Sequence, residues 1–214
     1  RHYCYTKSVA LVEYCTFGFK KTILQTLIFA TNNQHKVEEV RSVLKEQFQI
    51  ITLVEAGIHH DIPEPYDTIE ANALEKARVI FALTGNNCFG EDTGLEVEAL
   101  NGEPGVKSAR YAGEEKSFEK NTAKLLQNME GKQNRKAQFK TVIALVINGK
   151  EYLFEGICKG TIAKAPRGNK GFGYDPVFMP EGQTKTFAEM DMDEKNRYSH
   201  RRKAMDKLIV FLSS

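Results

Sequence analysis

The stretch Cys88-Phe89-Gly90-Glu91-Asp92-Thr93-Gly94-Leu95 places two adjacent carboxylates between glycines, directly after a short apolar pair. This pattern is typical of a buried strand that ends in an acidic turn at the edge of a sheet, where α/β proteins bind their ligands. Adjacent acids on such a turn can hold a hard cation, and one of them can act as a base toward water. The alternative is a solvated turn, since loops are polar in most proteins.

Length and composition describe an ordinary globular chain. Its 214 residues are sufficient for one domain, or for one domain in two lobes. With 30 basic and 28 acidic residues the net charge is +2, so no bulk field attracts nucleic acid or a membrane surface. The cysteines Cys4, Cys15, Cys88 and Cys158 form no C-x-x-C pair. That spacing argues against a zinc site and a disulfide framework, and it favours a reducing compartment.

The first 25 residues differ from the rest of the chain. Their apolar run at residues 9–12 is interrupted by Glu13, whereas a secretory signal or a membrane helix needs a longer uncharged run. We therefore expect residues 1–25 to be an extension outside the folded core, and residues 26–214 to form a single domain.

A strand, a polar turn and a helix are predicted next. Leu27-Ile28-Phe29-Ala30 is a buried-strand run, and Thr31 and Asn33 suit the cap of the helix that follows. A helix that begins after such a turn points backbone N–H groups at a phosphate. Lys36, on its first turn, can reach the same anion. Alternatively, Thr31 and Asn33 only cap the helix and Lys36 is solvated.

The remaining elements are predicted from apolar periodicity and turn signals. Strands that are interleaved with helices and followed by a long hairpin indicate an α/β fold with a mixed sheet. The predicted elements are a first helix whose apolar face ends at Phe48, a strand at 50–54, a helix to Leu83 with Asp67 and Glu70 as a capping box, a strand at 95–99, a helix at 117–129, a hairpin of 137–147 and 151–162 around Asn148-Gly149, and a last helix capped by Ser199.

Three further features carry possible chemistry. Glu64 lies between Pro63 and Pro65, so its carboxylate is held on a restrained, non-helical loop that suits a metal ligand, although a surface acid is the commoner case. The loop 168–176 holds two aromatic residues on either side of a glycine, which can grip a planar ring or simply pack in a tight turn. Arg201 follows the predicted cap of the last helix, where positive charge opposes the helix dipole.

Seven short motifs in one order resemble the inosine/xanthosine triphosphate pyrophosphatases, which remove deaminated purine nucleotides. Each motif is weak alone, but together they span residues 27–214 and are highly specific. They are Thr31-x-Asn33-x-x-Lys36, Pro63-Glu64, Glu70-x-Asn72-Ala73-x-x-Lys76-Ala77, Glu91-Asp92-Thr93-Gly94-Leu95, Pro104-Gly105-x-x-Ser108-Ala109-Arg110-Tyr111, Gly171-Phe172-Gly173-Tyr174-Asp175-Pro176 and Glu194-Lys195-Asn196-x-x-Ser199-His200-Arg201. Gln34-His35 departs from the family, in which smaller residues are frequent.

The resemblance implies roles at the matching positions. Glu64 and Asp92 would hold Mg²⁺, and Asp92 would also be the catalytic base toward the attacking water. The substrate would be bound by the phosphate loop, by a hydroxyl beside the acids and by the ring-gripping loop with the start of the last helix: Thr31, Asn32, Asn33, Gln34, His35, Lys36, Thr93, Phe172, Gly173, Tyr174, Asp175, Lys195, His200 and Arg201. Phe172 and Tyr174 would stack on any purine, whereas His200 and Arg201 would donate to the C6 carbonyl that adenine lacks.

The resemblance also implies a fold, an activity and partners. The expected fold is an elongated mixed α/β sheet with flanking helices, in two lobes around a central cleft. The expected activity is Mg²⁺-dependent hydrolysis of ITP, dITP and XTP to the monophosphate and pyrophosphate, by a cytoplasmic homodimer with no nucleic-acid or membrane partner. Two alternatives stay open: a pyrophosphatase for pyrimidine or modified nucleotides, and a nucleotide- or nucleic-acid-binding module that uses the basic run 201–203.

Overall fold

A computed structural model describes residues 25–44, 48–59 and 62–213 of the chain. The predicted extension at residues 1–25 therefore lies outside the described residues, apart from Gln25. The helices and strands, in chain order, are β1 (Gln25–Phe29), α1 (Gln34–Leu44), β2 (Phe48–Thr52), α2 (Ile69–Thr84), β3 (Cys88–Val97), β4 (Pro104–Gly105), α3 (Phe118–Asn128), β5 (Lys136–Ile147), β6 (Lys150–Ile162), β7 (Phe178–Pro180), α4 (Met192–Asn196) and α5 (His200–Leu212).

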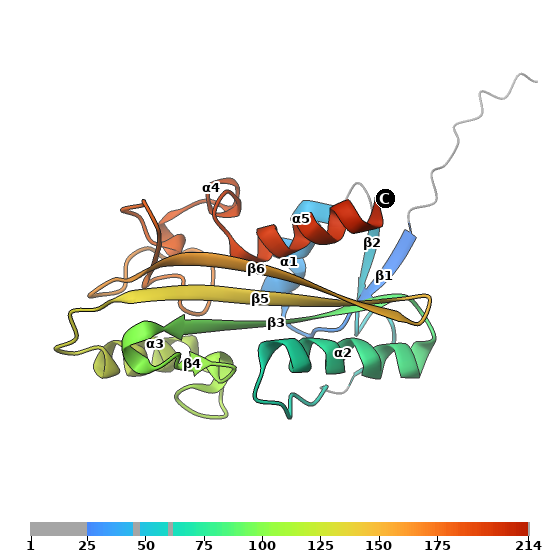
Figure 1. The fold of residues 1–214 in the computed structure, drawn as a ribbon, viewed down its shortest axis with the longest axis horizontal. Helices are drawn as coiled ribbons and strands as arrows, with labels where there is room; N and C mark the ends of the chain where they lie inside the picture. The colour runs from blue at the N-terminus through green and yellow to red at the C-terminus, as the bar shows by residue number, and fades with distance from the viewer. Residues whose placement is uncertain (1–24, 45–47, 60–61, 214) are drawn as a thin grey trace, which may run out of the picture.

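One mixed sheet organises the described residues. Its strand order is β2-β1-β3-β5-β6-β7, and the short β4 pairs with β3. The pairs β1/β2 and β1/β3 are parallel, whereas β3, β5, β6 and β7 follow one another antiparallel. The long β5–β6 hairpin runs along the long axis of the molecule (Figure 1). The prediction of an elongated mixed α/β fold is confirmed.

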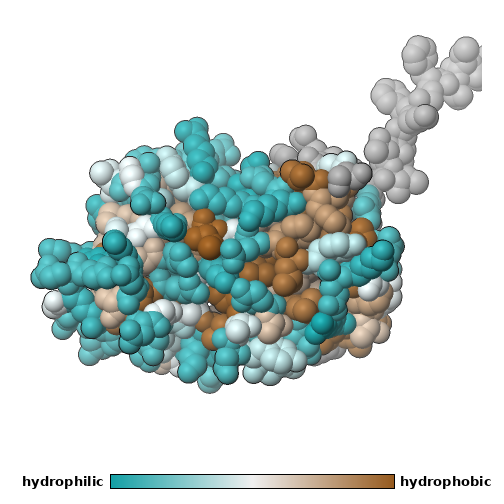
Figure 2. All heavy atoms as spheres, viewed as in Figure 1, coloured by the Kyte–Doolittle hydropathy of each residue, from teal (hydrophilic) through white to brown (hydrophobic). Residues whose placement is uncertain are grey.

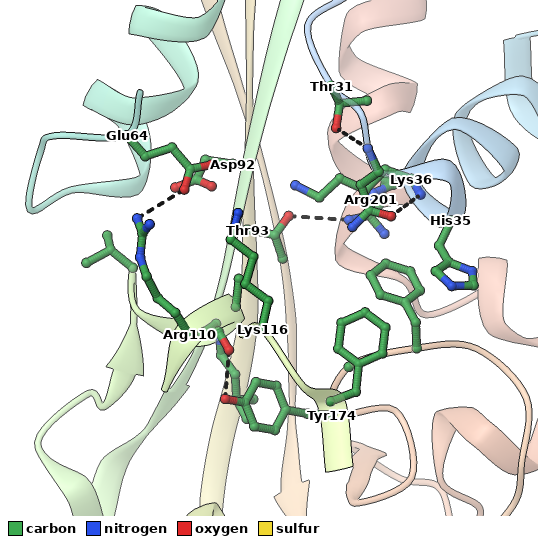
Figure 3. Close-up of a pocket in the computed structure, with 18 of the residues that line it drawn as sticks. Thr31, His35, Lys36, Glu64, Asp92, Thr93, Arg110, Lys116, Tyr174 and Arg201 are labelled. Atoms are coloured by element: carbon green, nitrogen blue, oxygen red, sulfur yellow. Dashed lines mark hydrogen bonds and ion pairs between the residues drawn. The ribbon is translucent and has the colours of Figure 1, made fainter. Parts of the chain in front are cut away.

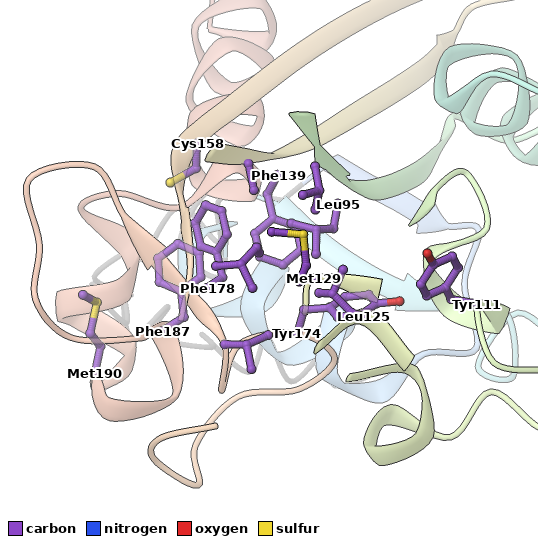
Figure 4. Close-up of a cluster of buried hydrophobic side chains, with 14 residues drawn as sticks. Leu95, Tyr111, Leu125, Met129, Phe139, Cys158, Tyr174, Phe178, Phe187 and Met190 are labelled. Atoms are coloured by element: carbon purple, nitrogen blue, oxygen red, sulfur yellow. The ribbon is translucent and has the colours of Figure 1, made fainter. Parts of the chain in front are cut away.

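Helices cover both faces of the sheet and divide the core into three clusters. Helices α1 and α5 pack on one face, and α2 packs on the other (Figure 1). The third cluster fills the distal lobe, where α3 and the segments after β6 surround the far ends of β3 and β5 (Figure 4). Large aromatic residues dominate it, and Phe139, Phe178 and Phe187 pack with ring centroids 4.6–6.2 Å apart. Within the described ranges, no helix is long and apolar enough to span a membrane.

The predicted acidic turn at residues 90–94 is wrong, because these residues lie inside the continuous strand β3. The strand pairs residue by residue with β5 from Cys88 to Val97. Its glycines serve close packing instead of a turn. A Cβ on Gly90 would collide with the carbonyl oxygen of Ala73 and lie 2.8 Å from the Cβ of Lys76, so glycine lets α2 approach β3 closely.

Three predicted boundaries are also corrected. Phe48 is not on the first helix but begins β2, which ends at Thr52. Helix α2 is capped by Thr68, whose side chain accepts from the backbone N–H of Ala71, so no capping box forms between Asp67 and Glu70. The error at α2 arises because adjacent residues can serve as caps, and only the backbone path selects one.

Other local predictions are confirmed. Asn148 and Gly149 have φ values of 51° and 74°, as a type I′ turn between β5 and β6 requires. Ser199 caps α5 through its side chain. The helix predicted from about residue 117 begins as α3 at Phe118, and the side chain of Ser117 caps it. One further boundary is corrected: the strand predicted at 95–99 ends at Val97, and a 3-10 turn, Glu98–Leu100, follows it.

We predict that Gly90→Ala destabilises the protein by about 3 kcal/mol, because the new methyl group must displace the backbone of α2. Urea unfolding of purified protein measures the change in the free energy of unfolding. Gly85→Ala is the matched control: Gly85 has a φ of 66° with open space around it, so only backbone strain of about 1 kcal/mol is expected. Equal losses in the two variants would contradict the packing role of Gly90.

Candidate active site

A cavity of about 750 Å³ lies between the two lobes (Figure 3). That volume is in the range of pockets for nucleotide-sized ligands. Its walls come from the start of α1, the loop 62–64, β3, residues 106–110, the glycine-rich loop (residues 168–176) and the start of α5. Of the residues predicted to form the site, all line this cavity except Gln34, which is exposed to solvent and lies outside it.

The turn before α1 both caps the helix and faces the cavity. The side chain of Asn33 accepts from the backbone N–H of Lys36 at 3.3 Å, and Thr31 accepts from the N–H of Asn33 at 3.1 Å. The Lys36 ammonium enters the site and lies 3.2 Å from Glu91 Oε1. Burial lowers the pKa of Lys36, although Glu91 opposes the effect. The capping and binding interpretations of this turn are therefore compatible.

Glu64 and Asp92 come together around one cation. The Lys76 ammonium is 2.5 Å from Glu64 Oε1 and 3.1 Å from Asp92 Oδ1, and Arg110 reaches Glu64 Oε2 at 3.2 Å (Figure 3). Burial would lower the pKa of Lys76, but the two carboxylates outweigh it and raise that pKa. Burial raises the pKa of Asp92.

This pair of carboxylates fits a magnesium ion. Among the described residues no group of three or more His, Cys, Asp or Glu side chains could hold a metal. Mg²⁺ does not need one, because it retains several waters and binds through one or two carboxylates together with substrate phosphates. Lys76 already bridges Glu64 and Asp92, so a single cation can contact both.

Strand geometry gives the two adjacent acids different surroundings. Successive side chains of a strand point to opposite faces, so Asp92 faces α2 and its Lys76, whereas Glu91 faces α1 and α5. Glu91 is 1% exposed and lies behind the cavity wall. Thr93, on the same face as Glu91, donates to Glu91 Oε1 at 2.7 Å and lines the cavity.

A buried ion network lies behind the cavity. Arg201 binds Glu91 through Nε and Nη2 at 2.8 and 2.9 Å, and its Nη1 binds Glu39. Lys195 joins Glu39 at 2.8 Å and Asp175 at 2.6 Å. Burial alone would raise the pKa of Glu39, but Arg201 and Lys195 hold it at about 2. Burial would also raise the pKa of Glu91, but Arg201 and Lys36 together hold this pKa well below its usual value.

The aromatic wall is built from loop and helix residues. Phe172 stacks on His35 with ring centroids 5.1 Å apart, and Phe118 tilts against it at 5.9 Å. Tyr174 is 4% exposed and donates to the carbonyl of Ser108 at 2.9 Å. Phe118 lines the cavity from the first turn of α3, whereas Leu125 of the same helix is buried in the distal core.

His200 is buried beside this wall. Its ring stacks on Phe139 with centroids 4.5 Å apart, and its Nδ1 has no hydrogen-bond partner within the described part of the chain. Burial, with Arg201 and Lys195 nearby, lowers the pKa of His200 well below its usual value, so the imidazole is neutral. A neutral imidazole carries one N–H. Because buried N–H groups without an acceptor are rare, we assign this proton to Nε2 and leave the unpartnered Nδ1 unprotonated.

Several residues of the site were not assigned a role from sequence. The sequence does place Lys76 on the apolar face of α2, with Ala73 and Ala77. It places Glu39 in the same way on the buried face of α1, beside Val40. An ionisable residue on an apolar helix face needs a buried partner, but periodicity does not identify that partner.

The model of the Ham1 family matches residues 27–211. The chain belongs to the Ham1 family. A dITP/XTP pyrophosphatase of Flavobacterium psychrophilum is 53% identical over 188 residues, which are 88% of this chain and 99% of the relative. The dITP/XTP pyrophosphatase of Porphyromonas gingivalis is 50% identical over 190 residues, 88% of this chain and 98% of the relative. These relatives confirm the resemblance described from the motifs.

Solved Ham1 structures agree with the fold. A HAM1 protein from Coxiella burnetii has a TM-score of 0.82 at 36% identity, with 89% of this chain and 99% of that chain covered. The Ham1 protein of Staphylococcus aureus has a TM-score of 0.80 at 37% identity, with 88% and 98% covered.

We predict that Glu39→Gln lowers the free energy of unfolding at pH 7 by about 3 kcal/mol, because two buried cations lose an ionised partner. The folded pKa of Glu39, about 2, is below its usual value near 4.5. Glu39 therefore stabilises the fold above about pH 4.5, and this stabilisation is lost as the pH falls toward 2. Urea unfolding at several pH values should show a shallower acid loss in the variant.

The control for this prediction is Glu55→Gln. Glu55 also has a pKa of about 2, owing chiefly to its hydrogen bond with Arg41, but it is exposed. A loss below about 1 kcal/mol is expected for a surface pair. A loss at Glu39 no larger than that at Glu55 would contradict the role of the buried network.

Proposed function

We propose that this protein hydrolyses ITP, dITP and XTP to the nucleoside monophosphate and pyrophosphate in a Mg²⁺-dependent reaction. One observation carries the proposal: a single cavity holds two carboxylates that share the Lys76 ammonium, together with a buried histidine and an aromatic wall. The names of the Ham1 relatives, dITP/XTP pyrophosphatase, support it.

The test is product chromatography over a panel of purine and pyrimidine triphosphates, with and without Mg²⁺. Preferred turnover of pyrimidine substrates would favour the alternative substrate class.

Asp92 is the proposed catalytic base, and Glu64 with Asp92 holds the metal. Mg²⁺, when bound, neutralises and orients phosphate oxygens. Asp92 orients a water and accepts its proton while the water attacks the α-phosphorus and pyrophosphate leaves. Burial raises the pKa of Asp92, which makes its carboxylate a stronger base toward water. Lys36, Lys76 and Arg110 lie around this end of the cavity and stabilise charge on the leaving pyrophosphate.

His200 is the residue that we propose selects the purine. Its Nε2–H donates to a carbonyl at C6, and adenine would place an amino group against that donor. The hypothesis that Arg201 shares this task equally is revised. Its Nε, Nη1 and Nη2 groups already donate to Glu91 and Glu39, so its main effect on the base pocket is to hold neighbouring groups in place.

The proposal extends to assembly as a homodimer, which the resemblance implies. Apolar side chains gather on the face of the sheet between α5 and α2 (Figure 2). On β6, Leu153 is 50% exposed, and exposed apolar surface of this kind is suited to association. Sedimentation of the protein at micromolar concentration tests this part of the proposal.

We predict that Asp92→Asn lowers turnover of ITP by a hundredfold or more, about 3 kcal/mol, while nucleotide binding is retained. Glu64→Gln should chiefly raise the Mg²⁺ concentration needed for activity. Pyrophosphate release measures turnover, and calorimetry measures binding. The control is Glu70→Gln, which changes an acid that pairs with Lys140 outside the cavity. A folded Asp92→Asn enzyme with near-normal turnover would disprove the assignment.

We predict that His200→Phe narrows the preference for ITP over ATP about tenfold, because a stacking ring is kept and the donor is removed. Phe172→Ala should weaken both substrates alike, since stacking is similar for all purines. The measurement is kcat/KM for ITP, XTP and ATP in each variant. If His200→Phe lowers all three equally, His200 does not read the C6 position.

A further inference from the structure

The charges around the cavity are balanced except at one lysine. Among the described residues, six Lys or Arg side chains line the cavity. Five of them form ion pairs with five carboxylates: Lys36, Lys76, Arg110, Lys195 and Arg201 pair with Glu39, Glu64, Glu91, Asp92 and Asp175. The sixth is Lys116. Its ammonium has no partner among the residues that the structure describes, so it contributes an uncompensated positive charge.

The backbone presents Lys116 to the cavity. Lys116 belongs to the segment between the 3-10 turn Ser108–Arg110 and α3, directly before the cap Ser117. Its φ of 53° is in the left-handed region, which costs a residue with a Cβ about 1 kcal/mol. The nearby Glu115 is engaged by Lys120 at 2.7 Å. The side chain of Lys116 extends from this segment into the cavity, toward Thr93 (Figure 3).

The end of the cavity that Lys116 approaches is the one built for phosphate. Thr93 follows Asp92 on β3. The turn before α1, with Lys36, lies on the side of Thr93 away from Glu64 and Asp92 (Figure 3). A triphosphate brings close to four negative charges, and one divalent cation neutralises only about half of them. The paired cations can turn toward phosphate only when their carboxylates gain another cation, whereas Lys116 needs no such exchange. An additional, unpaired cation at this end meets the remaining charge.

We propose that Lys116 binds the phosphate chain of the substrate from the distal lobe, opposite the phosphate turn of α1. The inference rests on the proposed function for the identity of the substrate. It assigns a phosphate-binding role to a residue outside the predicted site. Because Lys116 contacts phosphate and not the base, its contribution is equal for all purines and increases with the number of phosphates.

The test measures binding of inorganic tripolyphosphate and of IMP by calorimetry, at a fixed Mg²⁺ concentration. Lys116→Met should weaken tripolyphosphate binding about tenfold, the usual effect of losing one charged hydrogen bond. IMP binding should change less than threefold, and Lys116→Arg should retain most of the wild-type affinity. With nucleotides, kcat/KM should fall by a similar factor for ITP, XTP and ATP.

Two further variants separate binding from folding. Lys116→Gly removes the ammonium and relieves the backbone strain, so it should keep or raise the melting temperature and still lose tripolyphosphate affinity. Lys120→Met removes a neighbouring ammonium that pairs with Glu115 outside the cavity, and it should bind tripolyphosphate like the wild type.

The proposal is overturned if wild-type protein does not bind tripolyphosphate, or if Lys116→Met and Lys116→Gly weaken it no more than Lys120→Met does. It is also overturned if Lys116→Met affects only inosine nucleotides, because that result would place Lys116 at the base. Turnover of ITP by the wild type is measured in parallel. Its absence would contradict the proposed function, while tripolyphosphate binding would still decide the role of Lys116.

Discussion

The bidentate ion pair between Arg201 and Glu91, extended to Glu39, is the interaction on which the site depends. It joins the start of α5, the middle of β3 and the buried face of α1. Removing these charges from water is costly, and only close pairing offsets the cost. The three elements therefore have little freedom to move apart without exposing an unpaired buried ion. Because Glu39 also binds Lys195, and Lys195 binds Asp175, the same network holds the glycine-rich loop against the cavity.

Strand β3 gives its two neighbouring acids, Glu91 and Asp92, different surroundings. Glu91 is fully engaged with Arg201 and Lys36 on one face, whereas Asp92 faces α2 and the cavity on the other. A turn would have let both carboxylates reach the same cation. The strand prevents this, so the carboxylate that shares Lys76 with Asp92 is that of Glu64, on a distant loop. Gly90 permits the close approach of α2 that brings Lys76 to these acids.

Among the described residues, every cation that lines the cavity except Lys116 is paired with a carboxylate before any ligand binds. Lys76 bridges the two candidate metal ligands, and Arg110 also binds Glu64. A divalent cation that binds Glu64 and Asp92 would compete with these partners and release their positive charge toward phosphate oxygens. Such exchange of partners lets one set of residues stabilise both the empty and the occupied site, since buried carboxylates are never left without a cation.

The sequence alone determined the fold class, the β5–β6 hairpin at Asn148-Gly149, the cap at Ser199 and, through motif order, most residues of the cavity. These follow from local patterns that need no knowledge of distant residues. The tertiary structure alone decided that the acidic stretch is a strand, that Gln34 faces solvent, and that Arg201 is held by Glu39 and Glu91. The physical reason is distance along the chain: Glu39 and Arg201 are 162 positions apart, and periodicity carries no information about which buried charges will meet.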